Sequence, residues 1–226
     1  RWSKKRKRAI RSSRVDSTTL LSEAITNMDK KPEVFIVASA IGWYGDRGDE
    51  ELTEESSIGE GFLPGVCSDW ENASSNLSSE VRHVYLRSGI VLSGTGGALG
   101  KMLFPFKMGA GGPMGSGKQW MSWISLDDEI YAIHHLLMET GSKGVYNLTA
   151  PNPVRQKGFA KTLGRVLRRP AFAPLPGFVI KILFGEMGVK LTLESQKVLP
   201  NRLLEEGYEF LHPDLEPALQ DTLGLW

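Results

Sequence analysis

The chain has 226 residues, of which 41% are hydrophobic and 23% charged, and its formal net charge is +1. This composition is typical of a globular protein with one large domain or two unequal ones, and it excludes a chain that is mainly disordered. No apolar run approaches the roughly 18–20 residues of a membrane helix, so we expect no membrane association. A single cysteine, Cys67, excludes a disulfide framework. We therefore expect a reducing compartment, the cytoplasm or an organelle interior, and see no signal peptide.

The first segment is strongly basic, with eight Lys or Arg among its first 14 residues and no acid. Helical spacing of apolar residues predicts a helix from Ser3, as N-cap, to near Asn27. That spacing spreads the charges around the helix axis, which favours a solvated face. A phosphate-binding or nuclear-targeting patch is the alternative, but we expect no nucleic-acid partner.

The next elements alternate between strand and helix. Val34–Ala38 is an apolar run without polar alternation, which is typical of a strand buried on both faces of a parallel sheet, and His83–Leu92 is predicted as the next buried strand. A helix over Cys67–Ser79 separates them, and Gly144–Thr149 forms a further strand. This order predicts an α/β fold with right-handed crossovers.

Beyond Ser93 the chain is rich in glycine, and a short strand is then expected over Trp123–Leu126. Asp127 would cap a helix that runs to Glu139. The C-terminal third predicts amphipathic helices over Phe159–Leu167, Phe178–Phe184, Leu193–Leu204 and Leu215–Leu223. We therefore divide the chain into residues 1–150, with a substrate-side insertion at about 93–123, and a helical domain over 151–226.

Common catalytic motifs are missing from the sequence. The segment from Gly112 to Gln119 approaches a P-loop, but Gln119 lacks the hydroxyl that binds magnesium. The four histidines have no metal-ligand spacing among themselves or with Cys67, so no metal site is expected. Cys67 itself is more consistent with packing than with a nucleophile.

Three stretches nevertheless resemble a known family. They are Val37-Ala-Ser39-Ala-Ile-Gly-Trp-Tyr44-Gly45, Leu86-Arg87-Ser-Gly89-Ile-Val-Leu92 and Gly115-Ser-Gly117-Lys-Gln119-Trp-Met-Ser-Trp123-Ile-Ser-Leu-Asp127-Asp128. They are similar to extended short-chain dehydrogenases of the nucleotide-sugar epimerase type.

Further motifs, namely Ser13-Arg14, Asp69-Trp70-Glu71, Lys197-Val-Leu-Pro200, Gly207-Tyr-Glu-Phe210 and His212-Pro213, resemble the atypical "epimerase family protein" branch, which carries its own helical C-terminal domain. The resemblance runs the length of the chain. It implies a Rossmann-like fold that binds NAD(P), with NADP favoured over NAD, and an unknown small-molecule substrate that meets the nicotinamide beneath the C-terminal part.

The chain departs from this family in two ways. The glycine turn that binds the cofactor pyrophosphate is not in this sequence, so we expect a partial sheet, a chain that looks N-terminally truncated, and weak NAD(P) binding by these residues alone. The usual Tyr-x-x-x-Lys pair is also missing, since no tyrosine has a lysine four residues on. By spacing, its position falls near Val66 to Trp70, and the hydroxyl expected four residues before Tyr44 is replaced by Ala40.

The resemblance and the expected strand ends select the candidate residues. Ser39 and Ala40 end a central strand, where open α/β sheets place ligands, and would line the nicotinamide pocket. By resemblance, Arg87, Gly89 and Ile90 also contact the cofactor. The remaining candidates are Tyr44 and Ser39 as catalytic residues, with packing of Tyr44 as the alternative, and Gln119, Trp120 and Trp123 as a substrate wall, with core packing as the alternative for the tryptophans.

Three classes of function follow. The first is an NAD(P)-dependent oxidoreductase or epimerase-like enzyme that lacks the usual catalytic pair. The second is a catalytically retired NAD(P)-binding protein with a regulatory or partner-binding role. The third is a binding module that uses the basic first segment. Fold alone cannot choose among them, and neither the substrate nor the oligomeric state can be derived from the sequence.

Overall fold

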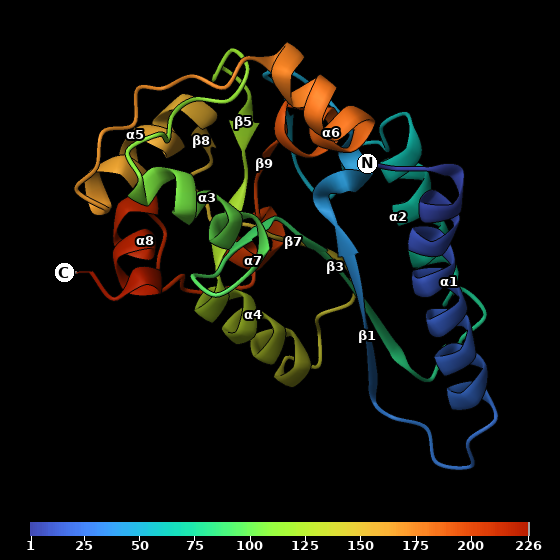
Figure 1. Cartoon of the computed structure of the whole chain (residues 1–226). Helices are drawn as coiled ribbons and strands as arrows, with labels where there is room; N and C mark the ends of the chain where they lie inside the picture. Colours follow the sequence, from blue (N-terminus) through green and yellow to red (C-terminus); the bar gives the residue numbers. More distant parts are fainter. Residues whose placement is uncertain (226) are drawn as a thin grey trace.

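The fold is built on a three-stranded parallel sheet (Figure 1). It comes from a computed structural model that describes residues 1–225. Its strands are β1 (Val34–Ala40), β3 (Arg82–Ser88) and β7 (Gly144–Leu148), in the order β1-β3-β7. Both pairings are parallel, which confirms the predicted α/β fold.

Helices cover both faces of this sheet. In Figure 1, α1 (Lys4–Thr26) and α2 (Phe62–Asn72) pack together on one side, and α4 (Leu126–Met138) lies on the other. Ser3 caps α1, as predicted, by accepting a hydrogen bond from the amide of Arg6. The helix expected over residues 67–79 instead begins five residues earlier and ends at Asn72.

The second long strand expected from the sequence is broken. Gly89 separates β3 from β4 (Ile90–Leu92), and β4 pairs in parallel with β6 (Trp123–Ser125) in a separate sheet. A Cβ on Gly89 would lie 2.8 Å from the carbonyl oxygen of Ser122 and 2.9 Å from Cγ2 of Thr149. The chain therefore changes sheets where only a glycine fits.

The C-terminal elements differ from the prediction in one place. α5 (Gln156–Val166), α6 (Gly177–Thr192) and α8 (Leu215–Leu223) confirm three of the four expected helices. The fourth, over 193–204, is wrong because this segment first pairs as a strand and then bends at Pro200. The elements found there are β9 (Lys197–Val198) and α7 (Asn201–Glu205).

Several short elements were not predicted. They are a 3-10 helix η1 (Ile41–Tyr44), β2 (Glu51–Leu52), α3 (Gly97–Lys107), β5 (Trp120–Met121) and β8 (Val154–Arg155). β2 pairs with β9 and β5 pairs with β8. These two small sheets join distant parts of the chain beside the carboxyl edge of the main sheet.

One buried cluster combines residues from both sides of position 150. Leu92 and Trp123 pack with Phe159 and Leu163 of α5 and with Leu219 of α8. A second cluster lies between the main sheet and α4, and contains Val84, Leu86, Ile124, Leu136, Tyr146 and Leu148.

At the start of α4, the role predicted for Asp127 as the helix cap is wrong. Ser125, not Asp127, is the N-cap, since its hydroxyl oxygen accepts the amide of Asp128. Asp127 is exposed in the first turn, where its charge favours the helix dipole. Within residues 1–225, no helix combines the length and apolar content that a membrane crossing requires.

Candidate functional site

Three polar side chains stand in register at the carboxyl edge of the main sheet. Ser39 of β1 is opposite Arg87 of β3, and Arg87 is opposite Asn147 of β7. All three are buried. Because parallel strands end at a common edge, this row lies where open α/β sheets bind ligands.

A carboxylate from α2 completes the row. Glu71 accepts hydrogen bonds from Nε and Nη2 of Arg87, both at 2.9 Å, and from the hydroxyl of Ser39 at 2.7 Å. The Arg87 side chain is 4% exposed and that of Glu71 is 9% exposed. The bidentate geometry and the additional Ser39 bond offset the cost of burying two charges.

The candidate catalytic residue Tyr44 belongs to the same network. Its hydroxyl donates to Oδ1 of Asn147 at 2.7 Å and accepts from Nη1 of Arg87 at 3.2 Å. Tyr44 is fully buried, and burial raises the pKa of its phenol. The two hydrogen bonds of its hydroxyl connect η1 to β7 and β3.

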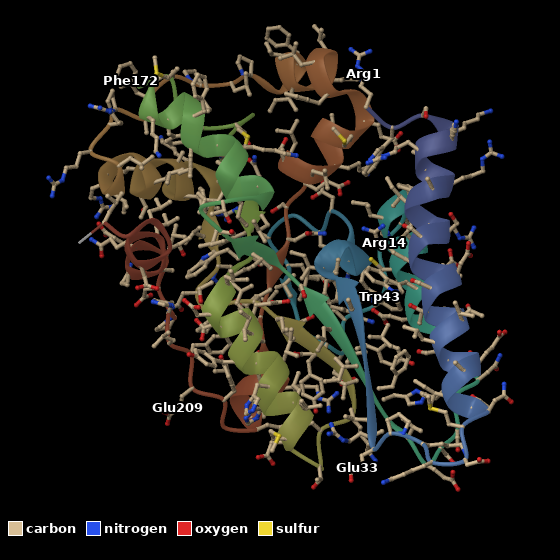
Figure 2. All side chains as sticks on the ribbon, turned by 60° about the horizontal axis from the view of Figure 1, so that its bottom comes forward. Arg1, Arg14, Glu33, Trp43, Phe172 and Glu209 are labelled. Atoms are coloured by element: carbon tan, nitrogen blue, oxygen red, sulfur yellow. The ribbon has the colours of Figure 1, made fainter. Side chains whose placement is uncertain are left out.

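Two further residues extend the network. The Trp43 ring lies 3.7 Å from the Arg87 guanidinium carbon, measured to the ring centroid. Figure 2 shows Trp43 on η1, at the end of β1 opposite Glu33. Oε1 of Glu54 accepts the backbone amide of Asn147 at 3.1 Å, and burial raises the pKa of Glu54.

The face of α2 that meets the end of β1 carries no hydroxyl and no amine. A Cβ built on Gly42 would lie 3.4 Å from Cβ of Leu63 and 3.6 Å from Sγ of Cys67. Leu63, Cys67 and Glu71 follow one another at four-residue spacing, so they share this face. Burial raises the pKa of the Cys67 thiol to about 11, which excludes a thiolate nucleophile near neutral pH.

The opposite face of the sheet edge holds a separate acidic group. Glu129 of α4 accepts the hydroxyl of Ser88, at 2.6 Å, on one carboxylate oxygen. Its other oxygen is buried without a hydrogen-bond partner. Burial raises the pKa of Glu129 to about 7, so the carboxyl carries a proton for part of the time at neutral pH.

The backbone of the predicted cofactor residues Gly89 and Ile90 is already used within the fold. The amide of Gly89 donates to Leu148, and the amide of Ile90 donates to Ser122. Ala40, at the end of β1, is half-buried and has only a methyl group as its side chain.

The three predicted substrate residues are not brought together into one wall. Gln119 is buried and its amide nitrogen donates to Met114 and Thr192. Trp120 is half-buried, with its ring nitrogen 3.2 Å from Asp49. Trp123 lies in the core with no exposed surface, because its indole fills the space between the small sheets and α5, and its ring nitrogen donates to Asn152.

A hollow of about 760 Å³ opens beside Gln119. Residues from the loop after η1, the glycine-rich segment and the start of α5 line it. Among them are Asp49, Lys118, Gln119, Arg155 and Lys157. Arg155 is paired with Asp49 at 2.6 Å.

Sequence reasoning missed Glu71, Asn147, Glu54 and Glu129 as members of the site. Asn147 did carry a signal, since it is an amide inside an otherwise apolar strand. Glu71 lay in a quoted motif without a role, and only the packing of α2 against the sheet reveals that it faces Arg87.

Known proteins resemble this chain over almost its whole length. The chain is 42% identical to "Epimerase family protein SDR39U1 homolog, chloroplastic" of Arabidopsis thaliana, over 97% of this chain and 64% of that protein. It is 38% identical to "Epimerase family protein YfhF" of Bacillus subtilis, over 99% of this chain and 74% of that protein. The chain thus spans about two thirds to three quarters of these relatives.

A solved structure gives the same result. The crystal structure of human epimerase family protein SDR39U1 (isoform 2) with NADPH matches with a TM-score of 0.95 and 36% identity, over 99% of this chain and 76% of that chain. Residues 175–222 match the domain of unknown function DUF1731. The chain therefore belongs to the epimerase family proteins of the SDR39U1 type, an atypical branch of the short-chain dehydrogenases with a Rossmann-like fold.

Proposed function

We propose that this chain forms the nicotinamide side of an NADPH site and acts as an oxidoreductase or epimerase-like protein at the carboxyl ends of β1 and β3. The observation that carries the proposal is the row Ser39–Arg87–Asn147 at the edge where α/β sheets bind ligands. The NADPH in the human relative, at 36% identity, supports this cofactor over NADH.

The residues at this edge are consistent with a nicotinamide ring and its ribose. Ala40 presents only a methyl group there and leaves room for a flat ring. On the same face, Glu129 keeps one buried carboxylate oxygen without a partner, and its other oxygen accepts the hydroxyl of Ser88 at the end of β3. A bound nicotinamide would supply a hydride donor or acceptor.

The residues of the buried network would position the strand and helix ends around the site and would take no part in the chemical step. Arg87 and Glu71 fix the ends of β3 and α2 relative to each other, and Tyr44 holds η1 against β7. The pKa of Tyr44 is raised and its hydroxyl is occupied at both ends, so it is poorly suited to proton transfer at neutral pH. Glu129 is the group at this edge whose pKa lies near neutrality, and we assign proton transfer to it.

A second candidate is an NADPH-binding protein without turnover. It is favoured by Leu63 and Cys67, which lie on the helix face toward the end of β1 where a Tyr and Lys pair would be expected. The two candidates differ in one observable: only the first oxidises NADPH faster with a carbonyl substrate present than without one.

Saturation-transfer NMR of NADPH on this chain tests the binding proposal, and it detects the weak affinity expected of these residues alone. We expect transfer to the nicotinamide protons to exceed transfer to the adenine protons. Ala40→Ile, which fills the strand end, should reduce the nicotinamide signal several-fold. Ala38→Ile, on the same strand face one pleat away, should leave it unchanged.

Two results would contradict the proposal. Equal or greater transfer to adenine would place the other end of the cofactor on this chain. An unchanged nicotinamide signal in Ala40→Ile, with the variant's fold verified by circular dichroism, would show that the ring does not bind at the end of β1.

A further inference from the structure

A second constellation lies where α4, α8 and the segment before α8 meet. Asp127 of α4, His212 and Asp221 of α8 each direct one ligand atom to a common point, and these atoms lie within 4.8 Å of one another. Both acids come from helices and the histidine from the connecting segment. Asp127 is far from the other two in the chain, so the spacing in the sequence does not reveal the cluster.

His212 is held rigidly at the centre of this cluster. It is 8% exposed, and its backbone amide donates to Oδ2 of the fully buried Asp128 at 2.9 Å. Its Nδ1 lies 3.3 Å from the hydroxyl oxygen of Ser125. The ring therefore has little freedom to turn.

The hydrogen bonds of Ser125 fix the tautomer of His212. The Ser125 hydroxyl donates its proton to Oδ2 of Asp128 at 2.8 Å. Toward Nδ1 of His212 it can act only as an acceptor, so Nδ1 carries the proton. The unprotonated Nε2 then lies 3.6 Å from Oδ2 of Asp221, without a hydrogen bond.

This arrangement is the one that metal-binding histidines use. Their second ring nitrogen is normally held by a neighbouring polar group, here Ser125 backed by the Asp128 carboxylate. In a tetrahedral zinc site with bonds of about 2.0–2.1 Å, neighbouring ligand atoms are about 3.3 Å apart, close to the distance from Nε2 to Asp221.

We propose that Asp127, His212 and Asp221 bind one divalent cation of the zinc type, with water as the fourth ligand. One nitrogen and two carboxylate oxygens suit zinc, whereas an imidazole ligand disfavours magnesium and calcium. The ion would join the first turn of α4 to α8, and so hold the C-terminal helix against the sheet domain.

Zinc titration of the chelator-treated protein by calorimetry tests this site. We expect one zinc ion per chain, and a weakening of at least tenfold in Asp221→Asn and in Asp127→Asn. Neither substitution empties a buried position, because both side chains reach solvent. Asp214→Asn is the matched control, since Asp214 lies in the same segment but bonds to Asn152 and should leave affinity unchanged.

A spectroscopic readout separates a metal site from an ion pair. The chain has four histidines, and zinc should shift the imidazole NMR signals of His212 alone among them. The alternative is a protonated His212 between two carboxylates, which needs no metal. Absence of zinc binding, or equal binding in both ligand variants and wild type, would overturn the proposal.

Discussion

Arg87 and Glu71 form a bidentate ion pair beneath the carboxyl edge of the sheet, with two bonds of 2.9 Å and almost no exposure to solvent. The pair joins β3, the middle strand of the main sheet, to α2. Because Ser39 and Tyr44 both bond to it, its geometry sets the shape of the whole edge.

Removing one member of this pair should be costly. Glu71→Gln leaves the Arg87 charge buried with a weaker partner, and we expect a loss of about 3–5 kcal/mol in the free energy of unfolding, measured by urea denaturation. Glu216→Gln removes a comparable carboxylate from the exposed pair with Arg165 and should cost about 0–1 kcal/mol. Similar losses in the free energy of unfolding of the two variants would show that the buried pair stabilises the protein no more than the exposed pair does.

Gly89 should tolerate no side chain. Gly89→Ala places a Cβ 2.8 Å from the Ser122 carbonyl oxygen, so the strands must separate. We expect a loss of roughly 1–3 kcal/mol, by the same urea measurement. Gly65→Ala in α2 is the matched control, because its Cβ meets nothing within 4 Å and alanine favours helix, and it should be neutral or stabilising by up to about 1 kcal/mol. A Gly89→Ala protein as stable as the Gly65→Ala protein would contradict this packing.

Glu129 should make the protein less stable as pH rises. Its pKa is about 7 in the folded state against 4.5 ordinarily, so above pH 4.5 the unfolded chain releases a proton that the folded chain retains. Stability is then lost between pH 4.5 and 7, by on the order of 2–3 kcal/mol. Glu129→Gln should lack this loss and be more stable than wild type at pH 8, but not at pH 4.

The control for that series is Glu139→Gln, which changes an exposed carboxylate at the end of the same helix. Its stability should follow the wild-type pH profile. If Glu129→Gln also followed the wild-type profile, the buried, unpartnered oxygen would not be the cause.

Asp128 should hold the C-terminal segment in place. Its two oxygens accept the Leu211 and His212 amides, and the hydroxyls of Tyr208 and Ser125. Asp128→Asn keeps only one acceptor oxygen, so we expect a loss of roughly 2–3 kcal/mol. Hydrogen exchange should show the earliest loss of protection at residues 208–212.

In metal-free buffer, the neighbouring Asp127→Asn should leave that exchange pattern unchanged, since Asp127 is exposed. Uniform loss of protection across the protein in Asp128→Asn, without a local effect, would argue against a specific role in anchoring the segment.

The sheet could be predicted because its strands are buried on both faces. Val34–Ala38 is apolar without alternation and Gly144–Thr149 is mostly apolar, and they appear as β1 and β7 within two residues. The break between β3 and β4 could not be predicted from the residues around Gly89 alone. It depends on the approach of Ser122 and Thr149, which are distant in the chain.

The location of the site could be predicted from the sequence, but not all of the residues that form it. Ser39 and Arg87 were expected at strand ends, and they do stand side by side. Glu71 and Glu129 are on helices. The sequence pattern does not show which face of each helix packs against the sheet, so it could not show that these two side chains point toward it. Arg87 and Asn147 are polar residues inside buried strands, and this pattern is the sequence signal by which the network could have been found.

The central claim is that the carboxyl ends of β1 and β3 receive the nicotinamide half of NADPH. Its most direct test is a titration of the 15N-labelled chain with NADPH, read as amide shift changes in a heteronuclear NMR spectrum. We expect the largest changes on residues 40–43 and 87–89. Changes concentrated on residues 116–119 and 157–161, which line the hollow beside Gln119, would contradict it.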